Sequence, residues 1–313
     1  MQGIWLQWQD GVFPFDLSWN NLILGPGARI IAFVLNATHN SVMTPDLRSI
    51  CGYRDDPSCK LCTIGGTRPK ANLHHILAGC HAALSDHRYT WRHDSVILTL
   101  LQVIQPTILR HNAKPPPARN IPVISKSFVT AGTATAKNKK KTIPRRSLLG
   151  SASDWKLLAD FRHNTYMFPP HIFSTKERPD ILLYSNASRT VIFGELSCPA
   201  EEGIKEARLF KQARYARLAE EIRARHWTVF DLTIEVGARG FVARSTYTFL
   251  RKISLSPSEA KHACCGVSEV AARCSYSIYL RHDKKTWSSA RTLLLPRSCK
   301  DPIYKIDPSL RDN

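Results

Sequence analysis

Two features common in exported and membrane proteins are missing from this chain of 313 residues. It contains no run of about 18 apolar residues, so no membrane-spanning helix is predicted. Its first residues, MQGIWLQWQDGVF, have neither a basic start nor a clean apolar segment. A secretory signal peptide is therefore not predicted either. We expect an intracellular protein, and the charge described next favours the nucleus.

Acidic side chains are scarce. Asp and Glu number 25 against 44 Lys and Arg, which gives a formal net charge of +19. An excess of this size favours a polyanionic partner, with DNA as the first candidate and RNA as the second. A basic protein bound at a membrane surface is the weaker alternative. The oligomeric state is not predicted.

The nine cysteines are an odd number, so they do not all pair in disulfides. Metal binding explains a CxxC motif in an intracellular chain better than disulfides do. Four residues between positions 59 and 80 have the spacing of a zinc knuckle: Cys59, Cys62, His75 and Cys80. Tetrahedral Zn²⁺ takes four such ligands in a closed structural site. His74 is the rival ligand, although it would leave a five-residue gap before Cys80.

The chain divides into three regions by composition. Residues 1–111 show a helical apolar pattern, which we expect Pro106 and the prolines at 115–117 to end. Residues 112–146 hold nine Lys or Arg and no Asp or Glu. We interpret this stretch as a basic, flexible linker, with a short strand from Ile121 as an alternative. Ordered structure is expected again from 147 to 313.

The basic linker is a candidate nucleic-acid contact, because Lys and Arg side chains displace the counterions of a phosphate backbone. A solvated linker or a localisation signal explains it equally well. The candidate contacts in this stretch are Lys139, Lys140, Lys141, Arg145 and Arg146. The sequence RYTWRH adds Arg88 and Arg92, beside aromatic residues that could stack on bases. A packing helix with a basic outer face is the alternative for RYTWRH.

The third region mixes strands with helices. Residues 155–161 form either a strand or a short helix. A helix is expected from Glu201 and an alternating strand from Trp227. Another helix begins after Ser256, because Pro257 and Glu259 complete a capping box. This order predicts an α/β or α+β domain with a mixed sheet flanked by helices.

Two short apolar segments in this region are joined by the turn formers SNAS, which predicts a β-hairpin. A turn centred between Ala187 and Ser188 places Asp180 opposite Glu195. Opposed residues point to the same face of an antiparallel pair, about 5 Å apart. Two carboxylates so close need a positive group between them, and a hard divalent cation fits. Two solvated charges at the hairpin mouth are the alternative.

A lysine interrupts the apolar face of the helix that follows. At about 100° per residue, Lys211 falls in the middle of the stripe that Ile204, Tyr215 and Ile222 form. A lysine there must reach solvent or meet a negative partner. Two carboxylates, a lysine and Mg²⁺ are the components of a phosphodiester-hydrolysing site. A buried structural ion pair is the alternative.

Together these residues resemble the C-terminal region of non-LTR retrotransposon polyproteins that carry a restriction-like endonuclease. The resemblance covers most of residues 17–290. It rests on the CxxC and HxxxxC pair, on RPD followed by Glu195, and on ELSCPAEE, KQARY and EVGARGF. It implies a helical zinc-knuckle region followed by a nuclease of the PD-(D/E)xK type. Arg214 and Ser197 stand where the family pattern has lysines, so the lysine has moved to the helix.

The resemblance implies that Asp180 and Glu195 bind Mg²⁺ as cofactor, while Lys211 and Tyr215 belong to the catalytic set. Asp160 is a further acid. We expect the polymerase of such elements to be absent, so that the chain is a truncated copy. The expected function is nicking of target DNA by phosphodiester hydrolysis. A catalytically inactive, zinc-containing nucleic-acid-binding relic is the alternative, and a zinc-stabilised protein-interaction domain is a weaker third.

Overall fold

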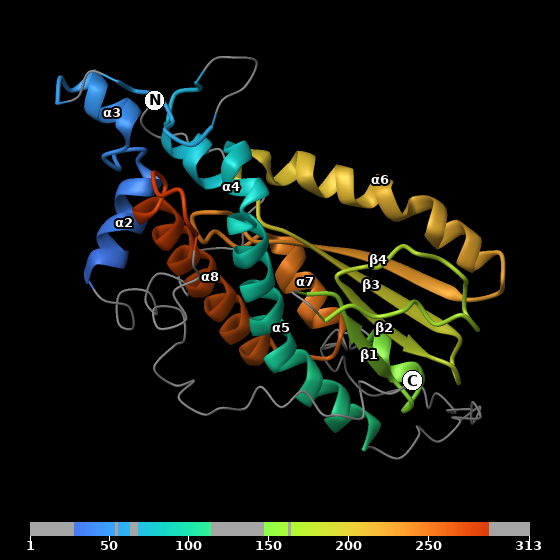
Figure 1. Cartoon of the computed structure of the whole chain (residues 1–313). Coiled ribbons are helices and arrows are strands. Elements are labelled where there is room, and N and C mark those ends of the chain that lie inside the picture. Colours follow the sequence, from blue (N-terminus) through green and yellow to red (C-terminus); the bar gives the residue numbers. More distant parts are fainter. Residues whose placement is uncertain (1–27, 54–55, 63–67, 114–146, 162–163, 288–313) are drawn as a thin grey trace, which may run out of the picture.

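The structure is a computed structural model that describes residues 28–53, 56–62, 68–113, 147–161 and 164–287. Within this part of the chain the fold is mixed α and β, with a four-stranded mixed sheet and helices on both of its faces (Figure 1). The predicted mixed sheet flanked by helices is confirmed at this level. Across the described ranges, no helix has both the length and the hydropathy needed to cross a membrane.

The sheet has the strand order β1-β2-β3-β4. Its strands are β1 (Lys156–Ala159), β2 (Ile181–Ser185), β3 (Thr190–Ser197) and β4 (Thr228–Glu235). The first three strands pair antiparallel, and β4 runs parallel to β3. The hairpin register is as predicted, with Ser185 opposite Thr190 and Ile181 opposite Gly194. The next two residues outward from that last pair are Asp180 and Glu195.

Helical elements precede, connect and follow the strands. Those before the sheet are α2 (Ala28–Thr38), α3 (Pro45–Ile50), η2 (His75–Gly79), α4 (His81–Ser85) and α5 (Arg88–Asn112). The later ones are η3 (Leu148–Ser151), η4 (Glu201–Gly203), α6 (Ile204–Arg223), α7 (Arg244–Lys252) and α8 (Pro257–Leu280). One expectation is wrong, because α5 continues through Pro106 to Asn112. Proline removes one helical hydrogen bond, and the packing of α5 on its neighbours outweighs that loss.

The sheet is buried on both faces (Figure 1). On one face, Val191 and Phe193 pack with Tyr215 and Leu218 of α6. The opposite face packs against α5, α7 and α8 through residues that include Ile192. Since successive side chains of a strand alternate between faces, Glu195 lies on the α6 face together with Val191 and Phe193. Burial on both sides makes these strands continuous apolar runs in the sequence.

The first predicted region is not packed separately from the third. Residues Val96, Ile97, Leu100 and Ile104 of α5 belong to the same apolar core as the sheet and α8. A second core surrounds the cysteine-rich segment and includes Ala272 of α8. The predicted boundary at residue 111 therefore does not divide two independent cores. Of the predicted linker, only residues 112 and 113 are described, so its candidate strand and its five basic contacts lie outside the described residues.

A buried ion pair connects the segment before α6 to the turn after β4. Arg239, only 2% exposed, donates to the Glu201 carboxylate at 2.6 Å from its backbone nitrogen and at 2.8 Å from Nη1. Its Nε atom donates to the carbonyl of Ala37 at the end of α2. Gly237 is required in this turn, because a Cβ atom there would lie 2.3 Å from Oε1 of Glu201. The sequence blocks ELSCPAEE and EVGARGF thus meet in space around one buried charge pair.

The capping box predicted for the last helix is present. The Glu259 backbone N–H donates to Ser256 Oγ at 3.2 Å, and the Ser256 N–H donates to Glu259 Oε2 at 2.8 Å. We expect Ser256→Ala to lower the free energy of unfolding by about 1 kcal/mol, because the first turn of α8 loses an acceptor. Urea unfolding would measure this change. Ser258→Ala, an exposed change two residues further along, is the control, and equal losses from the two variants would contradict the prediction.

Candidate functional site

The predicted acid pair lies at one end of the sheet, where β2 begins and β3 ends. The Asp180 backbone N–H donates to Glu195 Oε1 at 3.1 Å, and the Leu196 N–H donates to Asp180 Oδ2 at 2.8 Å. In each of these hydrogen bonds a carboxylate of one strand end accepts from the backbone of the other, so the start of β2 is joined to the end of β3. The Glu195 side chain is fully buried, whereas the Asp180 side chain is 16% exposed. The site is therefore accessible from the Asp180 side.

Lys211 of α6 points into this pair, as the apolar stripe predicted. Its Nζ atom lies 3.2 Å from Asp180 Oδ2 and 2.9 Å from Glu195 Oε2, and its side chain is 17% exposed. One ammonium group therefore compensates two carboxylates. The reading of these acids as solvated charges at a hairpin mouth is wrong.

A third acid on the same face has its own cation from the same helix. Glu235, at the end of β4, is fully buried and accepts hydrogen bonds from Arg208 Nε at 3.3 Å and Nη2 at 3.2 Å. Ser245 also donates to it. Arg208 and Lys211 are three residues apart and so lie on one side of α6. The helix thus carries two cations to two neighbouring strands.

Burial and neighbouring charges shift the pKa values of Asp180 and Glu195 in opposite directions. Burial and the neighbouring Asp180 charge raise the pKa of Glu195 to about 8, against the effect of Lys211. Burial also acts to raise the pKa of Asp180, but His93 and Lys211 outweigh it and lower that pKa to about 2. For Lys211 burial acts downward, and the two carboxylates nevertheless raise its pKa. Between these two pKa values, Asp180 therefore carries the negative charge of the pair.

Two other residues predicted for the site, Tyr215 and Asp160, contact the backbone or side chains just before β2. Tyr215 is 1% exposed, and its hydroxyl donates to the carbonyl of Arg178 at 3.0 Å. Asp160 accepts from Arg178 Nε at 2.9 Å, and its backbone N–H donates to the carbonyl of Asp180 at 3.0 Å. In this structure Tyr215 and Asp160 thus hold the backbone around Asp180.

A further residue of the site has no signal in the sequence. His93, from α5, places Nε2 3.4 Å from Asp180 Oδ2 and Nδ1 3.1 Å from Asp94 Oδ1. Burial acts to lower its pKa, but the hydrogen bonds to Asp180 and Asp94 raise it to about 9. Nothing in the spacing of the sequence relates residue 93 to residue 180. Only the packing of α5 against the end of the sheet brings them together.

The two arginines of RYTWRH are not surface groups, so their predicted contact with phosphates is wrong. Arg88 and Arg92 are each 1% exposed. Arg88 donates to the carbonyls of Arg281 and Lys284, both at 2.7 Å. Arg92 donates to the carbonyls of Leu77 at 2.9 Å and Cys198 at 2.9 Å. Each guanidinium satisfies buried carbonyl groups of segments far apart in the chain, which is a structural role.

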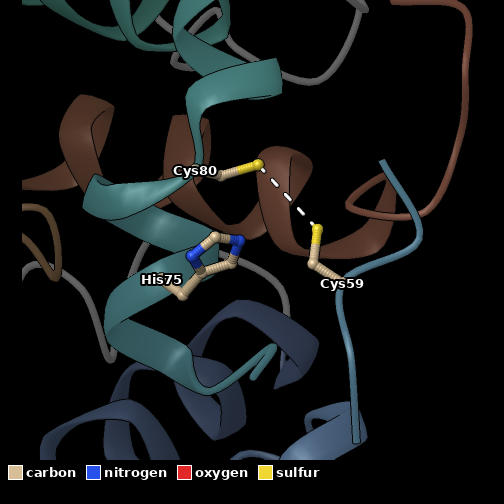
Figure 2. A group of neighbouring side chains, drawn as sticks. All are labelled: Cys59, His75 and Cys80. Atoms are coloured by element: carbon tan, nitrogen blue, oxygen red, sulfur yellow. Dashed lines mark hydrogen bonds between the residues drawn. The ribbon is translucent and has the colours of Figure 1, made fainter. Parts of the chain in front are cut away.

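Three of the four predicted zinc ligands form a buried cluster (Figure 2). The donor atoms of Cys59, His75 and Cys80 all lie within 4.8 Å of one another. The Cys59 and Cys80 sulfur atoms are 4.0 Å apart. This is near the roughly 3.8 Å expected of two thiolates on one tetrahedral zinc ion and well beyond a disulfide bond. The three residues could therefore hold a metal ion such as zinc.

The chemistry of the cluster agrees with a metal site. His75 Nε2 is buried and has no hydrogen-bond partner among the described residues, although buried polar atoms usually have one. The hydrogen bond between the two sulfur atoms lowers the pKa of the Cys59 thiol and raises that of the Cys80 thiol, so Cys59 is the one that favours the thiolate form that binds metal. The rival His74 is not in the cluster, because its Nδ1 atom lies 2.8 Å from Glu202 Oε1. Cys62 is buried nearby but lies outside the group of three.

No known protein-family model matches this chain, and no curated protein matches it significantly. Its function must therefore be inferred from the geometry of the acid pair and the cysteine cluster.

For the cysteine cluster, we expect the purified protein to contain one zinc ion per chain. Cys59→Ser and Cys80→Ser should each remove it, because a hydroxyl is a far weaker zinc ligand than a thiolate. Elemental analysis after dialysis measures the content. Cys51→Ser is the control, since Cys51 is exposed and outside the cluster. Full zinc content in the Cys59 and Cys80 variants would contradict the assignment.

For the acid pair, we expect Glu195→Gln to change how stability depends on pH in the absence of divalent cations. The folded protein keeps a proton on Glu195 that the unfolded chain releases, so stability present below about pH 4.5 is lost as the pH rises through about 8. Glutamine does not titrate. The stability of the variant relative to the wild type should therefore rise, by on the order of 2 kcal/mol, between about pH 5 and pH 9.

Urea unfolding across this pH range measures the difference. Glu206→Gln, an exposed change on α6, should show no such trend. A constant difference between Glu195→Gln and the wild type at every pH would mean that Glu195 ionises normally.

Proposed function

We propose that this protein is a metal-dependent DNA endonuclease that hydrolyses phosphodiester bonds at the end of the sheet. The observation that carries the proposal is the position of the Lys211 ammonium between the Asp180 and Glu195 carboxylates. A mixed sheet with helices on both faces and an acid pair at the end of its two central strands supports a restriction-like nuclease fold. This arrangement agrees with the resemblance of the sequence to nucleases of the PD-(D/E)xK type. We include that nuclease type in the proposal.

The acid pair suits a hard divalent cation. Asp180 and Glu195 supply carboxylate oxygens at one partly open place, and Mg²⁺ binds proteins through one or two such groups. When bound, Mg²⁺ would lower the pKa of water and neutralise charge on the phosphate. The high pKa of Glu195 means that this residue must lose a proton before it can act as a ligand.

The side chains around the acid pair have separate roles in the proposed reaction. Lys211 keeps its proton, because the carboxylates raise its pKa, and its ammonium stabilises negative charge that develops on the scissile phosphate. Tyr215 holds the backbone before Asp180 through its bond to Arg178. Together they keep the acids in one orientation before DNA binds, which is how a preorganised site lowers a barrier.

The zinc centre has a structural role in this proposal. Cys62 is the proposed fourth ligand beside Cys59, His75 and Cys80, and a closed site of this kind does no chemistry. It fastens the segment that leads into α4 and α5. Folding free energy, not catalysis, is what the bound ion supplies.

DNA is the proposed partner, with RNA as the second candidate, and the nucleus is the proposed location. The net charge of +19 supports a polyanion. With Arg88 and Arg92 buried, other cations must contact the phosphates. Lys205, Arg214 and Arg217 are exposed on α6, the helix that carries Lys211. The five predicted contacts between Lys139 and Arg146 remain candidates outside the described residues.

A catalytically inactive nucleic-acid-binding protein is the second candidate. One observation favours it: Ser197 stands two residues after Glu195, where the family pattern has a lysine, so the site depends on Lys211 from α6. Binding needs the basic surface but not the acid pair, so the two functions separate in an experiment.

For the nuclease, we expect the purified protein to nick supercoiled plasmid DNA in the presence of Mg²⁺ or Mn²⁺. Asp180→Asn, Glu195→Gln and Lys211→Met should each lower the nicking rate by about 100-fold or more. The first two remove a carboxylate ligand of the proposed metal ion, and the third removes the cation that stabilises charge on the reacting phosphate. Conversion of supercoiled to open-circular plasmid on agarose gels measures the rate.

Two exposed changes, Glu206→Gln on α6 and Lys252→Met on α7, serve as matched controls for charge. Their nicking rates should stay within about threefold of the wild type, and circular dichroism checks that every variant is folded. DNA binding with no metal-dependent nicking by the wild type would favour the inactive binding protein. Nicking that survives the double change Asp180→Asn and Glu195→Gln would overturn the assigned site.

A further inference from the structure

The segment Arg92–Asp94 of α5 reaches the acid pair from a distant part of the chain. His93 lies between two carboxylates, with Nδ1 3.1 Å from Asp94 Oδ1 and Nε2 3.4 Å from Asp180 Oδ2. The side chains of His93, Asp94 and Asp180 are 22%, 7% and 16% exposed. The imidazole is thus held on one side and presents its other nitrogen to the site.

The described contacts of the Asp180 carboxylate gather on one oxygen atom. Oδ2 accepts from the Leu196 N–H at 2.8 Å and from Lys211 Nζ at 3.2 Å, and His93 Nε2 approaches the same atom. Two hydrogen-bond donors, from β3 and α6, and an ion-pair contact from α5 thus meet at this one oxygen atom. Within the described residues this leaves Oδ1 as the oxygen available to a cation.

Arg92, next to His93, fixes the position of α5 at the same place. Its guanidinium donates to the carbonyl of Leu77, to Ser275 Oγ at 3.0 Å and to the carbonyl of Cys198. Leu77 lies between the ligands His75 and Cys80, and Cys198 lies three residues after Glu195. A single buried side chain therefore joins the cysteine cluster, α8 and the end of β3.

We propose that His93 is a positioning residue for the acid pair, holding the Asp180 carboxylate through Nε2 while Asp94 holds the imidazole through Nδ1. Helix α5, which follows the cysteine-rich segment, thereby completes a site whose acids belong to the sheet. The activity part of this inference rests on the proposed nuclease function, but its metal-binding and stability parts do not. Groups that orient metal-binding side chains commonly contribute 10- to 100-fold to metal affinity or activity.

Two substitutions separate positioning from a need for the imidazole itself. Glutamine at position 93 can place its amide nitrogen near the position of Nε2 and donate to Asp180. Asparagine can place its amide near Nδ1, where it reaches Asp94 but not Asp180. We expect His93→Gln to bind Mn²⁺ or Mg²⁺ within about threefold of the wild type, and His93→Asn and His93→Ala to bind 10- to 100-fold more weakly.

Isothermal titration calorimetry with each metal on the full chain measures the affinities. His262→Asn, an exposed change on α8, is the matched control and should bind as the wild type does. Equal affinity in His93→Ala and the wild type would overturn the proposal. A loss in His93→Gln as large as in His93→Asn would also overturn it, because the imidazole would then act by more than holding Asp180.

A measurement without metal keeps the proposal testable if the wild type binds too weakly for calorimetry. In urea unfolding, the loss of stability from His93→Ala should fall by at least half when Asp180 is already Asn, because the partner's charge is gone. Additive losses would overturn the proposal. If the wild type fails to nick DNA while this coupling and the affinity pattern hold, the nuclease function fails and the positioning role stands.

Discussion

The sharing of one ammonium group by two carboxylates is the interaction on which the rest of this site depends. An isolated charge in a protein interior costs several kcal/mol, and an acid pair costs more because its members repel each other. Lys211 lies within hydrogen-bonding distance of both Asp180 and Glu195. Its reach depends on α6 lying across the sheet, which in turn depends on Tyr215 and Leu218 packing against Phe193. The apolar contacts of α6 with the sheet thus keep Lys211 in position between the two carboxylates.

Buried arginines connect the cysteine-rich segment to the sheet. Arg92 and Arg239 are each at most 2% exposed, and both bridge segments more than a hundred residues apart. A guanidinium suits this role because it offers five donors in one plane and remains charged in the interior. Arg88 and Arg92, which the sequence suggested as phosphate contacts or as part of a basic outer face, are therefore internal structural residues, and the phosphate contacts must come from other cations.

The cysteine cluster and the acid pair differ in what they can do. The cluster gathers soft donors, is buried, and includes a histidine nitrogen without a partner in the described ranges. Such a group suits an ion that stays in place and stabilises a fold. The acid pair gathers hard oxygen donors, is partly open at Asp180, and holds its two acids in different protonation states. Split protonation of neighbouring acids is frequent where chemistry occurs, although structural ion pairs also produce it.

The sequence alone determined what depends on local periodicity and spacing. The hairpin register follows from the turn formers between two apolar segments, and the capping box from Ser256 and Glu259. The inward direction of Lys211 follows from the 3.6-residue period of its helix. Tertiary structure decided the rest, because those contacts join residues with no periodic relation. Periodicity does not show that α5 packs through Pro106 against the sheet, that Arg88 and Arg92 are internal, or that His93 meets Asp180. Local rules give the direction of a side chain from its own element, whereas its partner depends on how the elements pack.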